Sequence, residues 1–304
     1  MNVKIYTHKV RATIDDDIIK FREYFKKLGL DLTLDIEETK VKKQDAFSLF
    51  EHIKLFTAPT TYQVVMYIYD RYAPNGEAKS WAFNYSKTLK TILLSTSIAD
   101  DNVDFTFMNM IHEFTHCIFY MLADRQIYLQ DPMDVSNFGN PPYTFNDQID
   151  NPKSAHAVAR LRLAPYYKLL DNKPMYKPKN FALKELVSKA TLDKYGEQAW
   201  QFLDERMLRN LQSIREQLGK PITVNTFLLQ QRCFDPAEER GPYSQHAHGR
   251  AVDFSVSGMT AQEVRNWLKT ASLPEPNIWV EEDVGWIHMD VRVSEYKGVY
   301  FFKP

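Results

Sequence analysis

Two short segments in the C-terminal part of the chain most constrain its fold, because each pairs strand-like alternation with potential metal ligands. Residues 244–253 read SQHAHGRAVD, and residues 286–292 read WIHMDVR. Alternation around Asp253 and His288 places both side chains on the polar face of a strand whose other face is apolar. Two adjacent strands of this kind can present His246, Asp253 and His288 to one ion. The pattern therefore predicts a split metal site.

The residue types at this site favour zinc in a catalytic role. Two imidazoles and one carboxylate fill three positions of a tetrahedral zinc ion and leave the fourth open for water. Gly249 and Ala251 are small, which lets the backbone turn closely around the ligands. We expect His248, inside the same segment, to hydrogen-bond to the ligand shell or lie at the surface rather than bind the ion.

The S-x-H-x-x-G-x-A-x-D segment followed by W-I-H-M-D resembles the zinc D-alanyl-D-alanine carboxypeptidase and L-alanyl-D-glutamate endopeptidase family, which shares its fold with the Hedgehog signalling domain. Further upstream, residues 180–186 (NFALKEL) and 215–224 (REQLGKPITV) are similar to the opening of phage-type members. The resemblance covers roughly the last 125 residues, about the size of one compact domain. It implies an α+β domain with an antiparallel sheet.

The resemblance implies that His246, Asp253 and His288 bind zinc. It also implies that Arg232 grips a substrate carboxylate, although its spacing to His246 is not a close match. A guanidinium fork suits a terminal carboxylate. The alternative for this half of the chain is a domain that keeps the fold of this family but has lost its catalytic activity.

The general base departs from the commonest family pattern. Many members place an acid three residues before the last histidine, and this chain has Gly285 there. The Hedgehog-type spacing of six residues indicates Glu282, with Glu281 as the second choice. Trp286 stands where some relatives have a second histidine, and we expect its ring to wall the site.

A second metal signal lies upstream, where residues 111–116 read IHEFTH. Apolar residues recur at helical spacing across 107–122 and predict a buried helix. On a helix, His112 and His116 lie one turn apart and can bind one zinc ion, while Glu113 can polarise its water. This is the zincin signature, and it predicts a zincin-like N-terminal domain.

The third ligand of this second site stays open. Leu122 occupies the position at which metzincins carry a third histidine, so that spacing is excluded. The candidates, which the sequence does not rank, are Asp124, Asp131, Asp134 and His156. The alternative is a core helix with hydrogen-bonded histidines, or a degenerate zincin that packs without cutting.

A length of 304 residues exceeds the usual size of one domain and favours two domains. We expect the fold class of the chain as a whole to be α+β. We expect the zincin-like domain at 1–164, a proline-interrupted linker at 165–179 and the carboxypeptidase-like domain at 180–304. Strand-like runs at 62–69 and 91–96 precede the histidine-bearing segment. Helical periodicity appears at 18–28 and 45–53, and His52 is expected at the surface.

Charge and apolar runs limit the partners. The formal net charge of −1 and the absence of a long basic stretch disfavour nucleic acid, and Lys40–Lys43 is expected to be a solvated face. Apolar runs are too short for a membrane span, and the N-terminus does not resemble a secretory signal. We therefore expect a soluble chain made in the cytoplasm. The two cysteines, Cys117 and Cys233, are not expected to form a disulfide.

These patterns predict a two-headed zinc metallopeptidase. Its C-terminal site would cut peptidoglycan stem peptides, as carboxypeptidase or endopeptidase, and a second zinc protease site would lie in the N-terminal half. The phage-type resemblance implies a phage or prophage context, with action on the wall after lysis or from within a virion, in which virion proteins would be partners. The alternative is a virion structural or wall-binding protein that uses both folds as scaffolds. A Hedgehog-like signalling ligand is disfavoured by the missing signal peptide.

Overall fold

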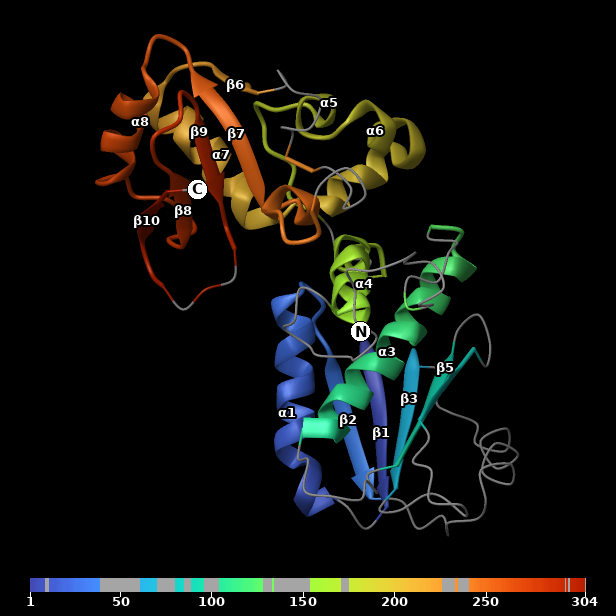
Figure 1. Cartoon of the computed structure of the whole chain (residues 1–304). Coiled ribbons are helices and arrows are strands. Elements are labelled where there is room, and N and C mark those ends of the chain that lie inside the picture. Colours follow the sequence, from blue (N-terminus) through green and yellow to red (C-terminus); the bar gives the residue numbers. More distant parts are fainter. Residues whose placement is uncertain are drawn as a thin grey trace. The chain divides into compact units, whose positions relative to one another are not determined.

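The chain forms two compact units, Met1–Leu170 and Asp171–Pro304, in a computed structural model (Figure 1). Both mix helices with a five-stranded sheet. The structure describes residues 1–8, 11–38, 61–69, 80–84, 89–95, 104–127, 133, 154–170, 175–225, 233–234, 241–292, 294 and 296–303. The expected helix at 45–53, His52, Lys40–Lys43, Asp131, Asp134 and Arg232 lie outside these residues.

The first unit is built on a mostly parallel sheet. Its strands are β1 (Asn2–His8), β2 (Thr33–Glu38), β3 (Val64–Tyr69), β4 (Trp81–Phe83) and β5 (Lys90–Ser95), in the order β2-β1-β3-β5-β4. All neighbours run parallel except β4, which pairs antiparallel with β5 at the edge. The apolar runs predicted at 62–69 and 91–96 become β3 and β5, and Ile5 and Met66 in the central strands are fully buried.

Within the described residues, the helices of the first unit are α1 (Arg11–Lys27), α3 (Asp104–Asp124), α4 (Ala155–Leu163) and the 3-10 helix η2 (Ala164–Leu170). The helical periodicity at 18–28 and 107–122 is confirmed by α1 and α3. Phe21 and Phe25 of α1 meet Phe114 of α3 edge to face, with ring centres 5.1 and 4.8 Å apart. Figure 1 shows α3 lying across the sheet, so the predicted histidine helix is anchored in the core of this unit.

The second unit carries β6 (Ile222–Val224), β7 (Ala251–Val256), β8 (Ile278–Glu281), β9 (Ile287–Asp290) and β10 (Val299–Phe302), in the order β10-β8-β9-β7-β6. The expectation of an antiparallel sheet is wrong for one pair, because β10 runs parallel to β8. Both edges of β9 are occupied, one by β7 and the other by β8. The last strand, β10, therefore pairs with the open edge of β8, and it runs in the same direction as β8.

The helices of the second unit are α5 (Leu183–Leu186), α6 (Lys189–Tyr195), η3 (Gly196–Phe202), α7 (Glu205–Leu218), η4 (Gln245–His248) and α8 (Ala261–Leu268). Asp204 caps α7 by accepting a hydrogen bond from the Arg206 backbone N–H, and Gly219 ends the helix in the left-handed region. Cys117 in the first unit and Cys233 in the second are both buried, and no disulfide joins them.

The boundary between the units falls within the stretch expected to be a linker. Residues 164–170 instead form η2, with Tyr167 and Leu169 buried. Pro165 does not prevent this helix, because a proline in the first turn of a helix forfeits no internal hydrogen bond. At the other end of the stretch, Lys177 pairs with Glu197 at 2.8 Å. The start of the expected linker therefore belongs to the first unit, and its end contacts the second unit.

No described helix is long and apolar enough to cross a bilayer.

Candidate metal centre

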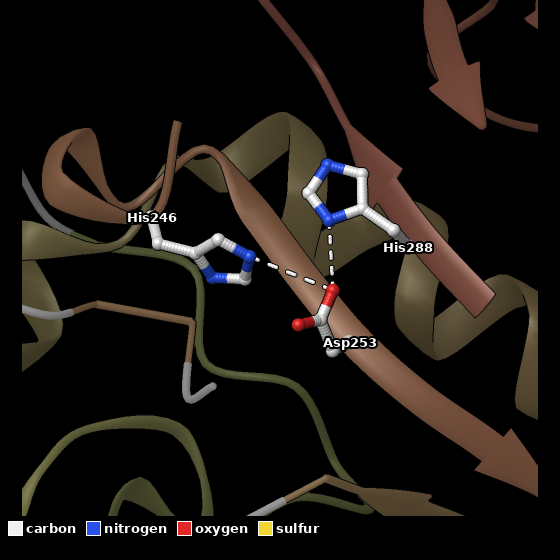
Figure 2. Close-up of side chains that lie close together, drawn as sticks. All are labelled: His246, Asp253 and His288. Carbon is white, nitrogen blue, oxygen red and sulfur yellow. Dashed lines mark hydrogen bonds and ion pairs between the residues drawn. The ribbon is translucent and has the colours of Figure 1, made fainter. Parts of the chain in front are cut away.

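The register of β7 and β9 creates the C-terminal site. The two strands pair antiparallel with Asp253 directly opposite His288, so both side chains leave the same face of the sheet. His246 comes from η4, the short helix that leads into β7. Figure 2 shows the three side chains converging on one point. The structure therefore brings together the three residues that the sequence motif selects.

The geometry of the three side chains fits a zinc ion. One ligand atom from each lies within 4.8 Å of the other two. His246 Nε2 and Asp253 Oδ1 are 3.5 Å apart, close to the roughly 3.3 Å that separates ligand atoms on a tetrahedral zinc. His288 Nδ1 hydrogen-bonds to the same oxygen at 2.7 Å. Because all three are largely buried, they form a prepared donor set rather than a chance surface cluster.

Electrostatics hold the site in a charged, paired state when no metal is bound. Burial alone would raise the pKa of Asp253, but hydrogen bonds with His246 and His288 outweigh it and hold the pKa well below its usual range. Burial alone would lower the pKa of His288, but hydrogen bonds to Asp253 and Asp290 raise it to about 9. A metal ion must displace the proton that these carboxylates stabilise on His288.

Asp290 is a functional residue for which the sequence analysis assigned no role. It is fully buried, and its Oδ2 lies 3.3 Å from His288 Nε2. This contact fixes the ring so that Nδ1 faces the site, as a carboxylate commonly does behind a metal-binding histidine. Arg292 neutralises Asp290 through Nε at 2.8 Å and stacks over the rings of Trp279 and Phe302. The alternation of strand β9 could have revealed Asp290, which lies two residues after His288.

The turn that carries His246 depends on its glycine and on His248. Gly249 has φ +64°, and a Cβ there would lie 1.8 Å from the carbonyl oxygen of Phe202. His248 Nε2 donates to the carbonyl of Pro242 at 2.7 Å, so it fastens the preceding loop. The backbone therefore passes Phe202 at a distance that only glycine permits.

The two candidate bases, Glu281 and Glu282, have different surroundings. Glu281 is the register partner of Phe302 in β10, and the Phe302 ring lies 6.1 Å from that of His288. Paired residues share a face, so Glu281 is on the metal-binding side of the sheet. Glu282 lies one residue beyond the end of β8, and its charge acts on Lys303, one residue beyond the end of β10, so the strand register does not hold it on that face. The strand register thus favours Glu281 as the general base over Glu282, the residue that the motif spacing indicates.

Trp286 lines a pocket of 460 Å³ formed by α8, β7 and the β8–β9 turn. Phe254 and Ile287 belong to the same lining. These two residues alternate with Asp253 and His288, so the pocket opens on the opposite face of the sheet. We place the chemistry at the histidines and not at this pocket, because it lacks a metal-ligating set among the described residues.

In the first unit, His112, Glu113 and His116 all lie on α3 as the motif requires. His112 Nε2 and His116 Nε2 are 3.3 Å apart. Glu113 is buried, and burial raises its pKa, while the two imidazoles and the backbone N–H of Ala82 oppose the rise. The carboxylate is therefore close to both imidazoles and to the edge strand β4.

The comparisons with known proteins concern different parts of the chain. A search of curated proteins finds no match. Among solved structures, archaemetzincin from Methanopyrus kandleri is 13% identical, with 39% of this chain and 73% of that chain covered and a TM-score of 0.32. Residues 175–290 match the family model described as peptidase M15. The matched stretch contains all three metal-site residues, so the part of the chain that is similar to peptidase M15 is also the part in which the metal-ligating side chains converge.

Proposed function

We propose that the C-terminal unit hydrolyses peptide bonds in peptidoglycan stem peptides as a zinc peptidase. The observation that carries the proposal is the convergence of His246, Asp253 and His288 inside the stretch that matches peptidase M15. Zinc held by these residues would polarise the scissile carbonyl and lower the pKa of its bound water. The substrate class rests on the sequence resemblance to enzymes that act on D-amino-acid-containing peptides.

Glu281 is the general base in this proposal. It lies on the metal-binding side of the sheet, where it can take the proton of the attacking water and return it to the leaving amine. Asp290 orients His288, and Arg292 keeps Asp290 ionised beside it. Arg232 is assigned the substrate carboxylate from the resemblance alone. A phage or prophage setting, with action on the wall after lysis or from a virion, is part of the same proposal.

The test is mass spectrometry of defined stem peptides incubated with the zinc-loaded full chain, with and without a chelator. Chelator-sensitive loss of D-Ala identifies a carboxypeptidase, and a cut after L-Ala identifies an endopeptidase. His288→Ala should abolish both bound zinc at this site and cleavage. Retained cleavage in that variant would contradict the assignment.

The adjacent glutamates supply a matched control. Glu281→Gln should keep zinc and lower turnover by about 10²- to 10⁴-fold, the usual contribution of a general base. Glu282→Gln should leave turnover within about twofold, because Glu282 lies beyond the end of β8 and the register does not hold its side chain on the metal-binding face. The reverse pattern would restore Glu282 as the base. Absence of cleavage in a zinc-loaded protein favours the alternative function, a wall-binding or virion scaffold.

A further inference from the structure

Arg292 lies beside the C-terminal metal centre, and one carboxylate connects it to a metal-site histidine. Its Nε and Nη2 both donate to Asp290, whose Oδ2 lies 3.3 Å from His288 Nε2. The backbone N–H of Arg292 donates to the same carboxylate at 3.1 Å. Asp290 is fully buried, whereas 32% of the Arg292 side chain is exposed. Asp290 therefore joins a buried metal-site residue to a cation that solvent reaches.

The guanidinium of Arg292 uses only one of its donor edges in these contacts. An arginine side chain holds five N–H donors in a rigid plane, and the edge formed by Nε and Nη2 faces Asp290. Within the part of the chain that the structure describes, no side chain or carbonyl accepts a hydrogen bond from Nη1. The edge formed by Nη1 and Nη2 is thus available, and its two parallel donors suit a carboxylate.

Two aromatic rings hold the guanidinium in place. The Cζ atom of Arg292 lies 4.6 Å from the ring centre of Trp279 and 4.8 Å from that of Phe302. Phe302 also meets His288 edge to face, with ring centres 6.1 Å apart. A guanidinium that is packed against rings loses little freedom on binding, and the apolar surroundings strengthen its hydrogen bonds. The available edge is therefore positioned before a ligand arrives.

The same edge of the sheet exposes aromatic surface. Tyr300 is the register partner of Trp279, with ring centres 4.2 Å apart, and the Tyr296 ring lies 5.2 Å from that of Tyr300. These two tyrosines are among the four large hydrophobic side chains that the described residues expose. Tyrosine and tryptophan are enriched at binding surfaces, because each joins an apolar ring to a polar group. Arg292 therefore borders a surface that suits a ligand, close to the metal centre.

We propose that Arg292 forms a carboxylate-binding subsite of the C-terminal unit and holds a carboxylate of the stem peptide through its Nη1–Nη2 edge. The inference rests on the peptidase function proposed above and adds a preference to it: the unit favours a peptide with a free carboxylate over its amidated form. A carboxamide has one acceptor oxygen and no charge, so it cannot accept both donors. Two groups of a stem peptide have the required chemistry, the free carboxylate of D-glutamate and the terminal carboxylate.

The test combines variants of the protein with variants of the peptide, using the zinc-loaded full chain. The peptide L-Ala-γ-D-Glu-L-Lys-D-Ala-D-Ala is prepared with both carboxylates free, with only D-glutamate amidated and with only the C-terminus amidated. Calorimetry gives Kd in the Glu281→Gln background, and kcat/KM is measured with the Glu281 protein. At the position that Arg292 binds, amidation should weaken both by about 10- to 100-fold, the usual value of charge-assisted hydrogen bonds. In Arg292→Gln, amidation at that position should change them by less than about twofold.

Arg209→Gln is the matched control. Arg209 also pairs with a carboxylate, that of Glu205, and its Cζ lies 4.4 Å from the ring centre of Tyr176. This variant should keep the full response to amidation. Arg292→Lys retains the charge without the planar fork, so it should keep only part of the response. The ratio between free and amidated peptides is the decisive quantity, because weaker zinc binding or a less stable fold would affect both peptides alike.

The outcomes separate the subsite from the peptidase function. Arg292→Gln that distinguishes free from amidated peptides as strongly as the wild type would overturn the subsite, and so would a failure of the free peptide to bind. If Arg292→Gln does not fold, as circular dichroism would show, an undiminished response in Arg292→Lys overturns it instead. Binding with the expected ratios but without cleavage would support the subsite and contradict the peptidase function. Cleavage with no response to amidation at either position would do the reverse.

Discussion

At the scale of single residues, the protonation of His288 controls access to the C-terminal metal centre. In the metal-free chain, Asp253 and Asp290 together raise the pKa of His288 to about 9, against an ordinary value of 6.5. Protons therefore compete with zinc below that pH. We expect zinc affinity to increase as pH rises towards 9 and to level off above it, with a proton released at each binding event below that pH.

Asp290→Asn tests this account. Without one of its two carboxylate partners, His288 should lose its proton at a lower pH, so the affinity curve levels off earlier. Above pH 9, where competition no longer matters, the variant should still bind zinc about 10- to 100-fold more weakly, because the ring is less well oriented. Isothermal titration in buffers of different ionisation enthalpy measures both quantities. An unchanged curve would show that Asp290 does not position His288.

At the scale of secondary-structure elements, the turn between η4 and β7 depends on the close passage of Gly249 by the backbone of Phe202. Gly249→Ala places a methyl group within that backbone and also imposes a left-handed conformation on alanine. The second cost alone is about 1–2 kcal/mol. We expect Gly249→Ala to lower the free energy of unfolding of this unit by more than about 2 kcal/mol and to weaken zinc binding.

Gly219→Ala is the matched control. Gly219 has nearly the same φ, +60°, but nothing lies within 4 Å of an added Cβ. It should therefore show the conformational cost alone, with zinc affinity unchanged. Denaturant titration of the metal-free proteins gives the two values. Equal destabilisation by both substitutions would mean that the Phe202 backbone moves aside freely.

The elements also show what a sequence can and cannot predict here. Alternation placed Asp253 and His288 on strand faces, and helical spacing placed His112 and His116 one turn apart, because both depend only on local periodicity. The choice between Glu281 and Glu282 required the register of β8 with β10, which no local pattern contains. No role was predicted for Asp290, because it acts through a histidine rather than on the ion.

At the scale of the whole molecule, two units with separate cores should unfold separately. Each has its own five-stranded sheet and buried apolar residues, and the expected linker packs onto the units at either end. A ligand that binds only the folded state at 100 times its dissociation constant adds about 2.7 kcal/mol to stability. Calorimetry of the metal-free chain should therefore show two transitions, of which saturating zinc raises the one belonging to Asp171–Pro304.

His288→Ala assigns that transition, since it should remove the zinc-induced shift from the C-terminal unit while leaving the other transition unchanged. The comparison of zinc-loaded and chelated samples at several heating rates separates true stabilisation from irreversible loss of the unfolded chain. A single transition that loses all zinc response in His288→Ala would mean that the two units unfold as one cooperative body.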